Sequence, residues 1–172
     1  VIVSIAAHSI EDYAAIAGWL DRVKRADAIE INISCPNIKG GLEFSREPDS
    51  TSAVVSAVRK KTSKPIITKL SPNVKDISEI AAAAQEAGSD AVSLVNTFTG
   101  MAVDIRTRMP VLGNIVGGLS GPAIKPIALR MVWETAKKVK IPIIGIGGIM
   151  DHEDALEFLI AGASAVQIGT AN

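Results

Sequence analysis

Short apolar stretches alternate with longer amphipathic segments along the chain. The segments between the apolar stretches carry apolar residues at helical spacing. Val and Ile dominate the apolar stretches, which is typical of buried strands. This alternation predicts an α/β fold with a parallel sheet. Strands are expected at Val1–Ala7, Ala28–Ser34, Pro65–Ser71, Ala91–Asn96, Ile141–Gly145 and Ala165–Ile168.

Local signals indicate where the helices begin. Ser9 is followed by acidic residues, which is typical of a helix N-cap and first turn. Asp49 or Ser50 is expected to cap the next helix, and a third is expected from about Val74. Asp151 is expected to cap the last helix.

The alternation fits either a doubly wound sheet or part of a (β/α)8 barrel. The chain opens on a strand, and no helix follows the expected strand at Ala165–Ile168. Parallel strands are normally covered on both faces, and a full barrel takes about 250 residues. We therefore expect residues 1–172 to be a single partial TIM-barrel domain of about six strands. The first two βα units and the final helix are expected to be absent.

Residues 97–121 show no helical period. A connection longer than about 12–15 residues in a compact domain is usually functional or disordered. The pattern leaves the folding of this segment open.

Composition excludes several classes of protein. The chain has 18 basic and 18 acidic residues, whereas a nucleic-acid binder usually shows a basic excess. The apolar stretches fall short of the ~20 residues that span a bilayer. We expect a cytoplasmic protein that binds neither nucleic acid nor membrane. Only 3% of the residues are aromatic, so the core must be built from Ala, Val, Ile and Leu.

Polar residues gather where the expected strands end, which is where ligands bind in α/β folds. Alternation puts Glu30, Asn32 and Ser34 on one face of their strand and the intervening isoleucines on the other. Polar side chains that point into a barrel need hydrogen-bond partners or a polar ligand. The alternative is that small polar residues at strand ends only satisfy nearby loop backbone.

Cys35 and Lys69 are the candidate reactive and charged groups. Cys35 follows a strand directly, where its thiol can face a cleft and act as a general base. Alternatively it is a small buried apolar residue. Lys69 lies within an apolar strand, where a charge is costly without a partner. We expect Lys69 to contact an anion or an electron-rich ring, rather than to lie at an exposed edge.

Two glycine signals at the last strands indicate a phosphate site. Gly147-Gly148 and Gly169-Thr170 end the fifth and sixth expected strands. Phosphate sites in barrels commonly use the loops after the last two strands. Tight turns also need glycine, so either signal by itself has a purely conformational explanation.

These residues together resemble the class 1 dihydroorotate dehydrogenases, which use a cysteine base. The resemblance implies an FMN-binding (β/α)8 barrel that oxidises dihydroorotate to orotate in pyrimidine biosynthesis. It spans nearly the whole chain and rests on the segments Asn32–Asn37 (NISCPN), Lys69–Pro72 (KLSP), Val95–Thr97 (VNT), Gly117–Pro126 (GGLSGPAIKP), Ile146–Ile149 (IGGI) and Ile168–Thr170 (IGT).

The resemblance implies a role for each matching residue. Cys35 would take a proton from C5 of the substrate as hydride leaves C6 for the flavin. The substrate would be bound by Asn32, Asn37, Asn96 and Thr97. The flavin would be bound by Asn32, Lys69, Val95, Gly121, Gly147, Gly148, Gly169 and Thr170. Among these, Lys69 would lie beside the N1/O2 edge of the flavin ring, and no metal is implied.

The segment from Ser120 to Pro126 looks more like the NAD-linked type, termed 1B, than the fumarate-reducing homodimer. That type implies a partner subunit that carries FAD and a [2Fe-2S] cluster, in a heterotetramer built on a homodimer. One cysteine cannot hold such a cluster in this chain. Two alternatives remain open: a domain resembling dihydropyrimidine dehydrogenase, and a barrel fragment that is catalytically incompetent.

Overall fold

The computed structural model describes residues 1–34 and 44–172. Within these residues one parallel sheet of six strands forms in the order β1-β2-β3-β4-β9-β10. Each strand therefore lies beside the next parallel strand along the chain, as in a barrel, whereas a doubly wound sheet reverses direction. This order confirms the partial barrel. The strands are β1 (Ile2–Ile5), β2 (Ala28–Asn32), β3 (Ile66–Lys69), β4 (Ala91–Leu94), β9 (Ile143–Ile146) and β10 (Ala165–Gln167).

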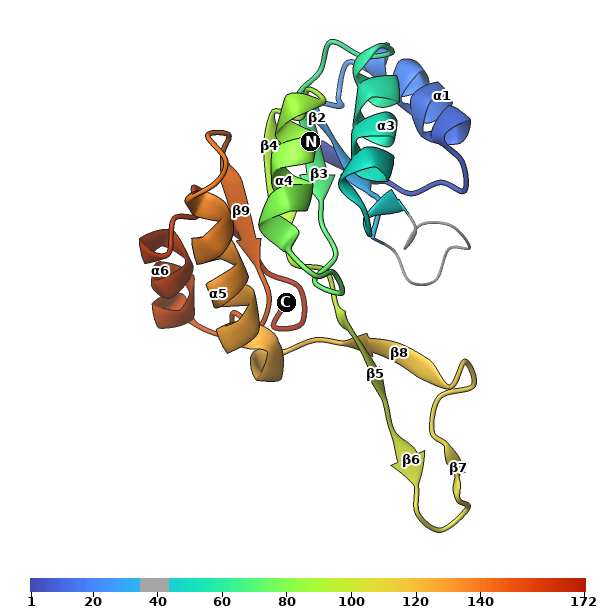
Figure 1. Cartoon of the computed structure of the whole chain (residues 1–172), viewed down its shortest axis with the longest axis vertical. Helices are drawn as coiled ribbons and strands as arrows, with labels where there is room; N and C mark the ends of the chain where they lie inside the picture. Colours follow the sequence, from blue (N-terminus) through green and yellow to red (C-terminus); the bar gives the residue numbers. More distant parts are fainter. Residues whose placement is uncertain (35–43) are drawn as a thin grey trace.

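Helices follow the strands and cover the outer face of the sheet (Figure 1). Ser9 and Asp151 cap α1 and α6 by accepting from the amides of Asp12 and Asp154, so both predicted caps are confirmed. Figure 1 shows α3, α4, α5 and α6 side by side along one side of the strands. The helices are α1 (Ile10–Asp21), α3 (Pro48–Arg59), α4 (Ile77–Glu86), η1 (Pro122–Ile124), α5 (Lys125–Ala136) and α6 (His152–Ile160).

Two predicted helix starts are wrong. The expected cap at Asp49 or Ser50 is replaced by Glu47, and Pro48 takes the first helical position. Proline suits that position because its fixed φ matches the helix and its missing N–H is not needed there. The helix expected from Val74 starts at Ile77, because the Asp76 side chain accepts from the amide of Ser78.

The core lies between the sheet and its helices. Ile29 and Ile31 are fully buried on the outer face of β2, and Ile33 just after the strand is fully buried too, as the alternation predicts. Burying each of these side chains stabilises the fold by about 1.5–3 kcal/mol. At β9, a Cβ on Gly145 would lie 2.5 Å from the ring of Phe158, so glycine is needed for α6 to pack there.

Residues 97–121, whose folding the pattern leaves open, form a projecting arm. In it β5 (Phe98–Met101) pairs antiparallel with β8 (Val116–Leu119), and β6 (Val103–Asp104) pairs with β7 (Met109–Pro110). Figure 1 shows this arm extending away from the sheet and helices. Its base joins the end of β4 to the start of η1, so the arm rises beside the ends of the strands.

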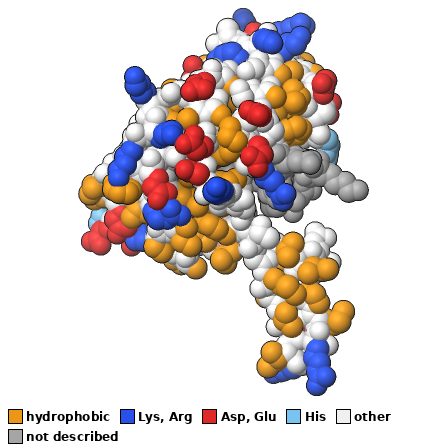
Figure 2. Space-filling view, viewed as in Figure 1, with side chains coloured by type: hydrophobic (Ala, Val, Ile, Leu, Met, Phe, Trp, Pro, Cys, Tyr) orange, Lys and Arg blue, Asp and Glu red, His pale blue; other side chains and the backbone are white. Residues whose placement is uncertain are grey.

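The arm carries large apolar side chains on its surface. Figure 2 shows them as a nearly continuous apolar area along the arm, with basic residues at its tip. No helix in the described part of the chain is long and apolar enough to cross a membrane. The exposed apolar residues of the arm are Met101, Val103, Ile105, Met109, Val111, Leu112, Ile115, Val116 and Leu119.

Candidate active site

The ends of β2 and β4 are joined by hydrogen bonds among the polar side chains of Asn32, Ser34 and Asn96, which we call the strand network. The Asn96 amide donates to the Ser34 hydroxyl at 2.8 Å and to its carbonyl at 3.2 Å. The same amide donates to Oδ1 of Asn32 at 3.3 Å, and the Ser34 hydroxyl donates to that oxygen at 3.1 Å. Asn32 and Asn96 are both predicted site residues. They are 64 positions apart in the sequence but meet at one site. Asn32 lies on the face of β2 opposite the buried Ile29 and Ile31, as the alternation predicts.

The Tyr13 side chain of α1 is hydrogen-bonded to this end of β2. Its hydroxyl donates to the carbonyl oxygen of Asn32 at 2.8 Å, and its ring is fully buried. The ring also meets that of Phe44 edge-on, with centroids 6.2 Å apart. Tyr13 was not predicted from the sequence, although a lone tyrosine among the apolar residues of a helix is a signal for a buried hydroxyl with a polar partner.

Asn73 is a second residue of the site that was not predicted from the sequence. Its amide donates to the carbonyl of Thr97 at 3.0 Å, and its Oδ1 accepts from the amide of Thr99 at 2.9 Å. These bonds fasten the base of the arm to the loop after β3. Its position could have indicated this role, because Asn73 directly follows the segment Lys69–Pro72, where an expected strand ends.

Thr97 lies between the strand network and the arm. Its amide donates to Oδ1 of Asn96 at 2.8 Å. A Cβ on Gly118 would overlap the Thr97 side chain, so β8 approaches this residue closely only because position 118 is glycine. The predicted substrate residues Asn32, Asn96 and Thr97 are thus brought together.

Lys69 ends β3 and is half-buried. The strand register pairs Lys69 with Asn32 on one side and with Ser93 on the other, so the three side chains form a row across the inner face. Lys69 forms no ion pair with any residue in the described ranges. An ammonium in this position that forms no ion pair with a described residue favours an anionic or electron-rich ligand. The contact predicted for Lys69 stays a prediction.

The glycine loops, defined as residues 120–121, 147–148 and 169–170, come together at the other side of the site. Gly121, Gly147 and Gly148 have φ of +83°, +133° and +74°, values that glycine adopts readily. A Cβ on Gly148 would lie 2.7 Å from the carbonyl oxygen of Gly121. The Thr170 hydroxyl donates to that of Ser120 at 3.1 Å, which brings the loop after β10 to the same place.

Val95 lies between the strand network and the glycine loops. It is buried, its amide donates to the carbonyl of Ile146 at 2.9 Å, and the Leu94–Val95 peptide bond is cis. A Cβ on Gly147 would lie 3.5 Å from the Val95 side chain. The site therefore extends without a break from β4 to the turn after β9.

Lys125, the first residue of α5, lies against the glycine loops at Gly148. Hydrogen bonds to Asp154 and Glu157 raise the pKa of Lys125 to about 12. The hydrogen bond from Lys125, together with that from the amide of Met150, lowers the pKa of Asp154. The Lys125 ammonium therefore links the start of α5 to α6, and Asp154 also accepts from the Met150 amide in the turn after β9.

Cys35 and Asn37 lie outside the described residues, so their roles stay predictions. The nearest described residue before them is Ser34, which belongs to the strand network. In residues 1–34 and 44–172 there is no group of His, Cys, Asp or Glu side chains that could hold a metal ion.

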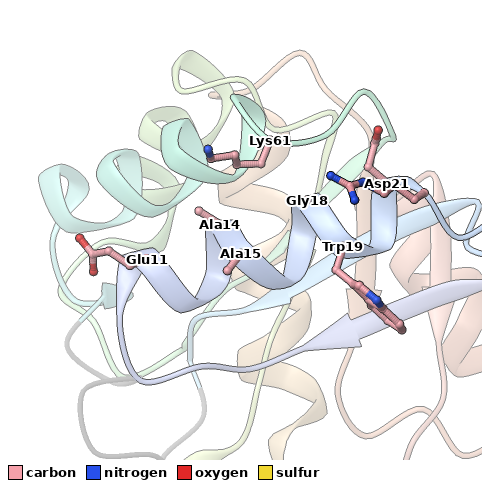
Figure 3. Close-up of a pocket in the computed structure, with 8 residues that line it drawn as sticks. Glu11, Ala14, Ala15, Gly18, Trp19, Asp21 and Lys61 are labelled. Carbon is pink, nitrogen blue, oxygen red and sulfur yellow. The ribbon is translucent and has the colours of Figure 1, made fainter.

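A separate groove of about 720 Å³ lies on the outer surface between α1 and the end of α3 (Figure 3). Glu11, Trp19, Asp21 and Lys61 line it together with small residues of α1. The Asp21 carboxylate is occupied by the hydroxyl of Thr62 and the amide of Ser63. None of the predicted site residues lines this groove, so it is distinct from the strand-end site.

The amino-acid sequence matches a known protein family along its whole length. The dihydroorotate dehydrogenase family matches the chain over residues 1–172. The chain belongs to this family. Enzymes of the family are flavoproteins, and the partial TIM barrel described above agrees with this membership.

Two curated members of the family are similar over the whole chain. The catalytic subunit of dihydroorotate dehydrogenase B (NAD(+)) from Geobacter metallireducens is 59% identical over 172 residues, which is 99% of this chain and 56% of that protein. The subunit of the same name from Geobacter sulfurreducens is also 59% identical, over 100% of this chain and 57% of that protein. The chain thus spans little more than half the length of these relatives.

Proposed function

We propose that the protein oxidises dihydroorotate to orotate with FMN as its bound cofactor. The observation that carries the proposal is the row of Asn32, Lys69 and Ser93, with Asn96 bonded to Asn32 above it. Amide groups and one ammonium at the ends of parallel strands suit a planar, anionic, hydrogen-bonding substrate next to an electron-rich ring. The relatives named as catalytic subunits support the same reaction.

The residues present fit a flavin phosphate. The backbone of the glycine loops packs closely, because a Cβ on Gly148 would clash with the backbone of Gly121 and of Lys125. Nothing lies within 4 Å of the Cβ position of Gly169, which leaves open space beside Thr170. In this proposal the flavin is held by Asn32, Lys69, Val95, Gly121, Gly147, Gly148, Gly169 and Thr170.

The chain's own residues bind the substrate and move its proton. When bound, the flavin supplies the acceptor for the hydride that leaves C6 of dihydroorotate. Cys35 takes the proton from C5 with its thiolate sulfur, and the two losses leave the C5–C6 double bond of orotate. Lys69 places positive charge where the ring gains negative charge.

The amides orient the pyrimidine. Asn96 and Asn32 are already hydrogen-bonded to one another and to Ser34, so their side chains are held before substrate arrives. Prior ordering reduces the entropy lost on binding. Asn37 and Thr97 complete the proposed substrate contacts.

We further propose partners for the protein. The relatives' names describe a catalytic subunit of an NAD(+)-linked enzyme, which implies a second kind of subunit. In our proposal that subunit carries FAD and a [2Fe-2S] cluster, and two copies of each subunit form a heterotetramer. The exposed apolar arm supports a homodimer of catalytic subunits, because apolar areas of this kind mark association surfaces.

Flavin reduction tests the reaction. Purified protein is expected to be yellow and to lose its flavin absorbance when mixed without oxygen with dihydroorotate. Dihydrouracil, which lacks the carboxylate, is expected to give no reduction. Faster reduction by dihydrouracil would replace the proposal with an activity like that of dihydropyrimidine dehydrogenase, and a protein that takes up no flavin would overturn it.

A further inference from the structure

A buried carboxylate lies beneath the site and has no part in the proposed reaction. Glu30 is 4% exposed and points into the barrel from β2. The hydroxyl of Ser4 on β1 donates to its Oε1, and the hydroxyl of Ser93 on β4 donates to its Oε2, both at 3.1 Å. Each carboxylate oxygen is therefore held, and Glu30 forms no ion pair with a described residue.

The bond to Ser93 puts the carboxylate beside the origin of Lys69. Strand β3 lies between β2 and β4, so a bond from Glu30 to Ser93 must cross the inner face of β3. Glu30 is in register with Ile67, whereas Ser93 is in register with Lys69. The carboxylate therefore reaches from the level of Ile67 toward the level at which Lys69 leaves the sheet.

Glu30 and Lys69 are opposite charges on one face that do not pair. A pair in contact would direct the ammonium down into the barrel and away from the strand ends. Instead the carboxylate is occupied by two hydroxyls, and the ammonium remains available above it. Opposite charges stacked along the strand direction make a field at the strand ends that is weaker than that of Lys69 by itself.

We propose that Glu30 and Lys69, as opposite charges on the inner face, together set the reduction potential of the flavin. The negative charge of Glu30 offsets part of the positive potential that Lys69 applies to the ring, and so keeps the potential lower than Lys69 by itself would. This inference rests on the proposed flavin site.

Three variants distinguish an effect of the Glu30 charge on the flavin from a structural effect of the Glu30 side chain. Glu30→Gln keeps the shape and can still bond both serines, because a serine hydroxyl can accept as well as donate. Glu30→Asp keeps the charge but shortens the reach to the serines. A role in charge predicts a larger change for Gln, whereas a structural role predicts a larger change for Asp. Glu86→Gln, on the exposed side of α4, is the control for net charge.

The measurement is the midpoint potential of the bound flavin, read from its absorbance against reference dyes. Glu30→Gln is expected to raise the ratio of affinities for reduced over oxidised flavin about tenfold, which is about 30 mV for a two-electron couple. Glu30→Asp is expected to stay closer to the unmodified protein, and Glu86→Gln to match it. Lys69→Gln is expected to lower the potential.

Compensation provides the second test. The double variant Glu30→Gln with Lys69→Gln is expected to have a potential between those of the two single variants. The double variant compared with Lys69→Gln measures the effect of the Glu30 charge a second time, and if Glu30→Gln does not fold, the potential of Glu30→Asp against that of Glu86→Gln is the remaining measure. An unchanged or lowered potential in Glu30→Gln, or a larger change in Glu30→Asp, overturns the inference while the flavin stays bound. A protein that binds no flavin overturns the proposed function first, and the inference with it.

Discussion

The Asn96 amide donates to the Ser34 hydroxyl at 2.8 Å, and this bond joins the end of β4 to the end of β2 across β3. The same amide also bonds Oδ1 of Asn32 and the Ser34 carbonyl. One side chain thus orders three polar groups of the site. Its removal should affect substrate binding more than flavin binding.

We expect Asn96→Ala to raise the KM for dihydroorotate at least about tenfold, a loss of ~1.4 kcal/mol. The reason is that the remaining amide of Asn32 loses its fixed orientation along with the contact itself. Steady-state kinetics at saturating acceptor measure the KM, and flavin absorbance measures occupancy. Asn114→Ala, on the arm, is the matched control and should leave both unchanged. A normal KM in Asn96→Ala would contradict this role.

Gly148→Ala should destabilise the glycine loops. Its φ of +74° disfavours alanine, and the new Cβ would meet the backbone oxygen of Gly121 at 2.7 Å and the backbone nitrogen of Lys125 at 2.9 Å. We expect unfolding to become easier by more than about 1 kcal/mol. Flavin retention on gel filtration should also fall.

Gly113→Ala is the control for that variant, because no atom lies within 4 Å of its Cβ position and its φ is ordinary. It should match the unmodified protein in thermal unfolding and in flavin content. Equal behaviour of the two variants would argue that the glycine loops have no special role.

Cys35→Ser tests the proposed base. A hydroxyl is a much weaker base than a thiol near neutral pH, so flavin reduction by dihydroorotate should slow by at least about a hundredfold. Flavin should remain bound, since the proposed flavin contacts are made by other residues. Stopped-flow single turnover measures the rate, and an unchanged rate would remove Cys35 from the mechanism.

The ion pair of Lys125 and Asp154 should make stability depend on pH at both extremes. Its hydrogen bonds raise the pKa of Lys125 from 10.5 to about 12, so the stability it contributes is complete below 10.5 and is lost as pH rises toward 12. The pKa of Asp154 is lowered from 3.8, so its contribution is present above that value and is lost as pH falls below it.

Urea unfolding across pH measures this effect. The difference in unfolding free energy between the unmodified protein and Lys125→Met should be constant at intermediate pH and should narrow in acid and in strong base. Lys140→Met, on an exposed loop residue, should show no such narrowing. A difference that stays constant into acid would contradict the pairing.

The arm should control self-association. Met101 and Val116 are neighbours in register on β5 and β8 and are 55% and 48% exposed. Replacing both with Lys introduces charge into the proposed dimer surface, and we expect the sedimentation coefficient to fall to that of a monomer. Leu156→Lys, at a position 52% exposed on α6, is the control. A dimer that survives the arm variant would move the interface elsewhere.

Much of the barrel could be predicted from local pattern. Alternation along β2 separates Ile29 and Ile31 from Glu30 and Asn32, because a strand that is apolar on one side can bury only that side. The caps at Ser9 and Asp151 are also local, since each side chain bonds an amide three residues away. The start of α3 was missed because Pro48 outweighs the capping residues that follow it.

The arm and its fastening could not be predicted in this way. Phe98 pairs with Leu119 across a long stretch of chain, and the arm has no buried face to impose a regular alternation. Asn73 and Tyr13 were missed for a related reason. Their bonds go to backbone atoms of distant segments, Thr97 and Asn32, and backbone acceptors leave no mark in the sequence.

By itself the sequence determined the strands, the helix caps at Ser9 and Asp151 and the chemical groups at the strand ends, because these depend on local periodicity and on residue type. The sequence already favoured a barrel over a doubly wound sheet, but only the tertiary structure gave the strand order, since that order depends on which strands are neighbours in space. It also put the Glu30 carboxylate within hydrogen-bond distance of Ser93, two strands away and in register with Lys69, because that contact depends on the register of neighbouring strands.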